Sequence, residues 1–323
     1  MKKIILLGLL CFSTLFTACN SSSFSYWIDN PTNESITVYI DEKAYEIPAQ
    51  TKIAVDLPFG KHQLKYKDQS LWFHNGGRIN SSTAIINPTQ GNYVFYKQLF
   101  MDKNDTRATK EFEEWAIQTQ SDSLRLAIND TIMTLFVPFQ VSNKIFISKS
   151  DFDWKYNIEE PMPEVVDLSN PIVTRRNRQL LNDPNYQAGR FQETVYKIFR
   201  EQEFFDFIRE VNQDKVVFLE EKKPYAELPK AKIVLTQMEK VKGEQYKQAL
   251  EDRLVGFHTW LNMEGSKSSK GFKDFFFSSQ LNELRTAYLA AYPDDYSFNQ
   301  ATNELNEQLN VFMRYQLNII DEE

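Results

Sequence analysis

The sequence has very little cysteine and histidine. It contains two cysteines and three histidines in 323 residues. Both cysteines, Cys11 and Cys19, lie near the N-terminus, so the rest of the chain has no thiol for a disulfide framework, a zinc site or nucleophilic catalysis. The histidines share no metal-ligand spacing. We therefore expect no metal site and no cofactor.

Familiar catalytic motifs are also missing. The chain has no G-x-S-x-G, no H-E-x-x-H, no G-x-x-x-x-G-K-[ST] and no G-x-G-x-x-G. Serine hydrolase, zinc protease, P-loop and dinucleotide-binding chemistry are therefore without support. A catalytic site built from carboxylates alone leaves little trace in a sequence. The missing motifs therefore do not exclude an enzyme that uses only carboxylates.

An uninterrupted long apolar run occurs only at the N-terminus. Lys2 and Lys3 precede a run over 4–16, which is shorter than the about 20 residues that span a bilayer. A basic start, an apolar run and small residues are typical of a secretory signal peptide. Three kinds of segment have this pattern: a signal peptide that is cleaved and lipidated, a signal peptide that is cleaved without lipidation, and an uncleaved membrane anchor. We favour the first.

The end of this segment resembles the lipobox of bacterial lipoproteins, in the residues Leu15, Phe16, Thr17, Ala18 and Cys19. The resemblance implies cleavage before Cys19, acylation of its sulfur and stable attachment to a membrane, since more than one acyl chain anchors a protein durably. Asn20 stands where an inner-membrane retention signal would have Asp, which favours the outer membrane, facing the periplasm. Residues 1–18 are then the signal peptide and 19–25 a lipidated tether.

The charge balance is acidic. The formal net charge is −7, and removal of 1–18, with Lys2 and Lys3, lowers it to −9. An acidic chain is a poor candidate for nucleic acid, so we expect no nucleic-acid partner. The hydrophobic content of 42% is enough for packed cores.

Alternating apolar residues dominate the first part of the chain. Ile36, Val38 and Ile40 share one face of a predicted strand, and 53–57 repeats the pattern. Turn-forming pairs such as Asn30-Pro31 separate these short strands. The spacing predicts an antiparallel β-sandwich-like domain over 26–104.

Part of this region resembles the PEGA-type β-modules of bacterial envelope proteins. The matching residues are Val38, Ile40, Asp41 and Lys43, then Pro58, Gly60, His62 and Leu64. The resemblance covers 36–66 and implies a non-catalytic module used for binding or spacing. It assigns a function to no individual residue.

An acidic stretch at 151–167 is the most suggestive candidate site. Its carboxylates and aromatic rings include Asp151, Asp153, Trp154, Tyr156, Glu159 and Glu160. Paired carboxylates beside aromatic rings are typical of glycan-handling sites. A calcium loop is less well matched, because the expected glycine and the later bidentate glutamate are missing. A merely solvated loop and a contact with a partner protein are the alternatives.

A short basic run follows the acidic stretch. Arg175, Arg176 and Arg178 could hold a phosphate, a lipid headgroup or an acidic partner through bidentate contacts. We favour the alternative, in which they pair with the acidic stretch and hold the domain together.

The second half has helical periodicity. We predict helices over 106–120 and over 188–212, and further amphipathic helices after residue 238. Two strands are predicted over 132–148 and one over 215–220, and a Ser/Lys-rich loop over 265–277. Residues 105–323 therefore form a mixed α/β to mainly helical domain, and the fold class is α+β.

These observations favour a lipid-anchored cell-envelope lipoprotein. We expect it to act without catalysis, as a binding or adaptor protein for another envelope or secretion component. The alternative is a carboxylate-dependent hydrolase or binder of cell-wall glycan that uses the acidic stretch.

Overall fold

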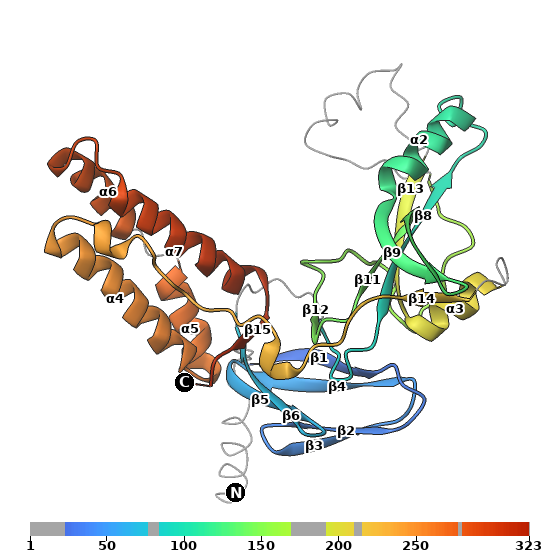
Figure 1. Ribbon diagram of the computed structural model, residues 1–323, viewed down its shortest axis with the longest axis horizontal. Helices are drawn as coiled ribbons and strands as arrows, with labels where there is room; N and C mark the ends of the chain where they lie inside the picture. The colour runs from blue at the N-terminus through green and yellow to red at the C-terminus, as the bar shows by residue number, and fades with distance from the viewer. Residues whose placement is uncertain (1–22, 77–83, 169–191, 210–214, 277–279, 323) are drawn as a thin grey trace, which may run out of the picture.

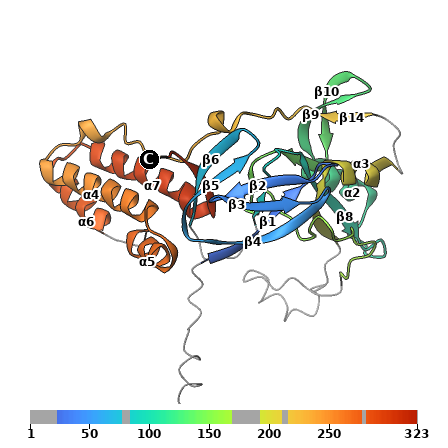
Figure 2. The same cartoon turned by 90° about the horizontal axis from the view of Figure 1, so that it is seen from below.

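The computed structural model describes residues 23–76, 84–168, 192–209, 215–276 and 280–322. Within them the fold is α+β, as predicted, with a β-rich N-terminal part and helices gathered toward the C-terminus. Three parts lie in a row, with a β-sandwich between a helical bundle and a small lobe (Figures 1 and 2).

The sandwich consists of two sheets. One has the strand order β12-β7-β1-β4, formed by Phe146–Ile147, Ile85–Ile86, Ser23–Asn30 and Thr51–Pro58. The other has the order β15-β6-β5-β2-β3, formed by Leu317–Ile320, Gln69–Asn75, Gly60–Tyr66, Ile36–Ile40 and Lys43–Ile47. The sandwich therefore includes two strands from outside 26–104.

The core of the sandwich follows directly from the alternation in the sequence. Ile36, Val38 and Ile40 point inward, while Thr37 and Tyr39 are exposed. They pack with Val55 and Leu57 from the facing sheet in one apolar cluster. Burial of every second side chain is the pattern expected when one face of a sheet contacts a core and the other contacts water.

The small lobe contains two three-stranded sheets. One has the order β11-β8-β13, formed by Phe139–Ser142, Tyr93–Met101 and Gln192–Arg200. The other has the order β10-β9-β14, formed by Thr131–Val137, Asp122–Ile128 and Val216–Phe218. Helices α2 (Lys110–Gln120) and α3 (Glu201–Arg209) complete it, and Phe204 of α3 is buried in the cluster that joins the two sheets.

The bundle contains four helices, α4 (Glu244–Leu261), α5 (Gly265–Phe276), α6 (Gln280–Ala291) and α7 (Ser297–Arg314). Helix α7 is amphipathic, as predicted for the segments after residue 238, and Ala301, Leu305, Leu309 and Phe312 are all buried on it. The apolar spacing of the sequence continues to Ile319, but that residue lies in β15 and not in the helix. After α7 the chain enters β15, which pairs with β6 and so ties the bundle to the sandwich. Among the described residues, no helix has both the length and the hydropathy to cross a membrane.

Two local predictions were wrong. The segment predicted as a helix over 188–212 is strand β13 over 192–200, followed by the helix α3. Val195, Ile198 and Phe199 have helical spacing, and all three are buried in the strand. Ile198 and Phe199 belong to separate apolar clusters, one on each face of β13. The predicted loop over 265–277 is the helix α5, whose Phe272 and Phe275 are buried in the bundle.

Candidate functional site

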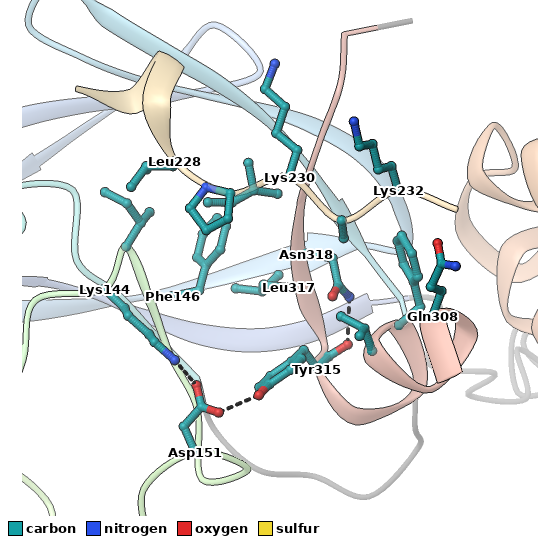
Figure 3. A pocket seen from close by; sticks show the side chains of 16 residues that line it. Lys144, Phe146, Asp151, Leu228, Lys230, Lys232, Gln308, Tyr315, Leu317 and Asn318 are labelled. Atoms are coloured by element: carbon teal, nitrogen blue, oxygen red, sulfur yellow. Dashed lines mark hydrogen bonds and ion pairs between the residues drawn. The ribbon is translucent and has the colours of Figure 1, made fainter. Parts of the chain in front are cut away.

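Asp151 is the residue of the acidic stretch that makes side-chain contacts with both a neighbouring and a distant segment of the chain. Its carboxylate accepts hydrogen bonds from Lys144 Nζ at 2.6 Å and from the Tyr315 hydroxyl at 2.5 Å (Figure 3). Burial and the hydrogen bond to this carboxylate raise the pKa of Tyr315. Asp151 therefore joins the acidic stretch to the C-terminal end of the bundle.

Trp154 lies in the core. Its side chain is 2% exposed and packs in a cluster with Phe95 and Ile198. Its indole N–H donates to Asn157 Oδ1 at 3.1 Å. The ring is therefore not available as a stacking platform for a sugar. Tyr156 is half-buried, and its backbone forms a parallel bridge with Lys197 of β13.

The remaining carboxylates of the stretch have separate environments. Asp153 is exposed. Glu159 pairs with Lys52 at 3.1 Å, and Glu160 accepts the Asn157 N–H at 2.6 Å. Because Asp151, Glu159 and Glu160 have different partners, the structure does not organise them as an acid and base pair.

Several predicted site residues lie outside the described part of the chain. They are Cys19, Arg175, Arg176 and Arg178. Within the described ranges, no group of three or more His, Cys, Asp or Glu side chains is arranged to hold a metal ion.

The sheet β10-β9-β14 has an exposed apolar face, which we call the outer face. Ile132 on β10 is 54% exposed and Phe136, four residues later on the same face, is 76% exposed. Ile132 is opposite Ala127 on β9, which is opposite Val217 on β14. An apolar row therefore crosses the three strands, with Ile132 and Val217 exposed and Ala127 between them buried. The opposite face of the sheet packs into the small lobe through Leu126 and Phe218.

Strand β10 is also an edge strand. In the described part of the fold it pairs with β9 on one side only. A seven-residue edge strand with an exposed phenylalanine is a surface to which another chain can add. Proteins usually protect such edges with charges, proline or a covering segment.

The prediction of strands over 132–148 located β10 but did not identify it as a binding surface. The run IMTLFVPF is apolar at almost every position, which is also typical of a strand buried on both faces. The signal that distinguishes the two cases is the threonine at 134 between two apolar residues on one face. That signal is too weak to assign exposure without the fold.

Comparison with protein-family models, with curated proteins and with solved structures returned no match.

Proposed function

We propose that this chain is a lipid-anchored cell-envelope lipoprotein that acts as a non-enzymatic adaptor for another envelope or secretion protein. The lipid anchor is expected from Cys19 and the residues before it. The observation that supports the binding role is the outer face, where Phe136 leaves 76% of its side chain exposed on an edge strand.

The partner contact we propose is a strand of the partner added to the edge of β10, with its apolar side chains on Ile132 and Phe136. Backbone hydrogen bonds to the unpaired edge would supply affinity, and the apolar row would supply burial. Aromatic side chains such as Phe136 are enriched among the residues that dominate binding energy. The glycan-hydrolase alternative has no comparable support, because Trp154 is buried and the acids have separate partners.

The test is crosslinking in cells followed by mass spectrometry. The wild-type chain is compared with an Ile132→Asp/Phe136→Asp double variant and with Cys19→Ser, which cannot be acylated. Val255→Asp is the matched control, because Val255 is 64% exposed on α4 and lies in the bundle rather than the small lobe.

We expect one dominant envelope partner for wild type and for Val255→Asp. Its yield should fall at least about tenfold in the outer-face variant, as expected when an aromatic residue that dominates binding is lost, and should also fall in Cys19→Ser. Circular dichroism melting checks that the outer-face variant is folded. A partner whose yield does not depend on the outer face would refute the proposed contact. Turnover of peptidoglycan by the purified chain would refute the non-enzymatic role.

A further inference from the structure

An apolar hollow that Asp151 borders lies between the sandwich and the helical bundle. We call it the junction pocket. It has a volume of about 410 Å³ and lies between the segment 228–232, the end of α7, and strands β12 and β15 (Figure 3). Its volume is within the roughly 300–1,000 Å³ typical of ligand sites, which often occur at such junctions.

The interior of the junction pocket is hydrocarbon and aromatic. Phe146, Leu228 and Leu317 line one part of it, and Val311 and Phe312 of α7 line another. Phe312 and Leu317 are themselves packed into the bundle and sandwich cores. The pocket is therefore continuous with the bundle core and the sandwich core. A hydrocarbon chain bound there would be removed from water.

Hydrogen bonds hold the wall of the pocket in place. Ala231 N–H donates to the Ile319 carbonyl at 2.7 Å. The Gln308 side chain of α7 bonds both backbone groups of Val234, accepting from its N–H at 2.6 Å and donating to its carbonyl at 2.8 Å. A wall fixed in this way keeps the pocket open without a ligand, so binding need not order it.

The charged side chains that line the pocket are mostly cationic. Lys144, Lys230 and Lys232 line it, against the single carboxylate of Asp151. Lys144 is paired with Asp151, and Lys230 pairs with Asp321 at 2.8 Å. Across the described ranges, no carboxylate forms a salt bridge with Lys232, although the hydrogen bond from Lys230 and the charges of Lys230 and Lys232 lower the pKa of Asp321. This positive rim stands out in a protein with a formal charge of −7.

We propose that the junction pocket binds a single-chain amphiphile with an anionic carboxylate head, such as a fatty acid. Its hydrocarbon chain lies over Phe146, Leu317 and Phe312. Its carboxylate is held by Lys230 and Lys232, which project from the same segment of the chain (Figure 3). A cation pair at the mouth of an apolar pocket favours an anionic head over a neutral one.

The experiment is photolabelling of the purified full chain, in maltoside detergent, with dodecanoic acid that carries a diazirine on its alkyl chain. Unlabelled dodecanoate and dodecanol serve as competitors, and mass spectrometry identifies the labelled peptides. Val311→Trp fills the pocket from a position that is 41% exposed, so that the core is not disturbed. Lys230→Glu/Lys232→Glu reverses the rim charge, and Lys267→Glu/Lys270→Glu makes the same charge change on exposed α5 residues.

We expect saturable labelling of the peptides around 146 and 311–319, with dodecanoate competing at least about tenfold better than dodecanol, a factor worth about 1.4 kcal/mol. Val311→Trp should abolish the labelling, the rim variant should weaken it about tenfold, and the α5 variant should leave it unchanged. Labelling that is not saturable, or that Val311→Trp leaves intact, would overturn the site. Equal competition by dodecanol would overturn the anionic head. Neither result bears on the adaptor proposal, which depends on Ile132 and Phe136.

Discussion

Arg200 at the end of β13 holds Asp29 of β1 through two hydrogen bonds, from Nε to Oδ2 at 3.0 Å and from Nη2 to Oδ1 at 2.6 Å. Both side chains are buried. The Tyr93 hydroxyl donates to the same carboxylate at 2.5 Å, and Arg200 also donates to Glu203 at 2.6 Å. This network joins the sandwich to the small lobe, so the position of the outer face relative to the sandwich depends on it.

Removing one member of this pair should destabilise the protein strongly. In Asp29→Ala the buried Arg200 guanidinium loses its two hydrogen bonds to Asp29 and keeps only the contact with the partly exposed Glu203, and we expect a loss of about 3–5 kcal/mol in urea unfolding. Lys110→Ala is the control, because Lys110 and Glu114 are exposed and 3.9 Å apart. Its loss should be below about 1 kcal/mol. A double variant, Asp29→Leu/Arg200→Met, should recover most of the stability, and failure to do so would mean that the pair is intrinsically stabilising.

The free energy of unfolding should rise in mild alkali because of Lys197. Burial lowers its pKa from 10.5 to about 8, although its ammonium donates to the carbonyls of Asn157 and Ile158 at 2.7 and 2.9 Å. Between pH 8 and 10.5 the unfolded chain binds a proton that the folded chain has released, so stability rises with pH there. The gain is at most about 3 kcal/mol.

The measurement for Lys197 is urea unfolding from pH 7 to 11, with Lys197→Met as the comparison. The difference between wild type and variant should change by this amount over the range, because the variant lacks the titrating group. A constant difference would show that the amine titrates normally.

His62 should stabilise the protein in mildly acidic solution. Burial alone would lower its pKa, but its hydrogen bonds to Asp41 at 2.5 Å and to the Pro58 carbonyl at 2.8 Å outweigh burial and raise it above 6.5. The same contact helps to lower the Asp41 pKa below 3.8 against the opposing effect of burial. The stabilising effect of the His62 charge is therefore complete below pH 6.5 and is lost as pH rises through the raised pKa.

Thermal melting of wild type and His62→Gln across pH 4 to 9 checks this prediction. The stability advantage of wild type should be largest between pH 4 and 6.5 and should shrink at higher pH. An advantage that does not vary with pH would show that the ion pair is not formed.

His74 should have the opposite pH dependence. Its ring is fully buried against Trp260, with ring centroids 4.4 Å apart, and within the described residues neither ring nitrogen has a hydrogen-bond partner. Burial lowers its pKa from 6.5 to about 3. Acidification below 6.5 therefore favours the unfolded chain, which binds the proton, by about 2 kcal/mol at pH 5.

The variant His74→Phe keeps the ring packing and removes two unpaired polar atoms. We expect equal or higher stability at pH 7, since no hydrogen bond is lost, and a smaller loss on acidification to pH 5. Urea unfolding at the two pH values measures both effects. A variant that is much less stable at pH 7 would reveal a hydrogen-bond partner for His74.

The strands and helices that border solvent on one side were predictable from the sequence. Strand β2 alternates strictly, and the stripe on α7 is regular, because in each element one face contacts a core and the other contacts water. Strand β13 was not predictable in this way. Ile198 faces one apolar cluster and Phe199 faces another, so burial on both faces removes the period of two.

The candidate sites depended more heavily on long-range contacts. Asp151 was identified as a candidate from its carboxylate, but its partners differ greatly in sequence separation, with Lys144 nearby and Tyr315 in the C-terminal part. Trp154 was a candidate for the surface, but it is buried because β8 and β13 supply a core around it. Composition shows that a residue is aromatic or acidic, whereas its neighbours decide whether it is available to a ligand.

The sequence by itself determined the α+β class, the alternation of the sandwich strands and the amphipathic helices, because these depend on the spacing of neighbouring residues. Its N-terminal residues also carry the expectation of a lipid anchor. Only the tertiary structure decided that β15 completes the sandwich, that Asp29 meets Arg200, and that Phe136 is exposed while Trp154 is not. These features require contacts between distant segments, and such contacts form only when the whole chain has packed.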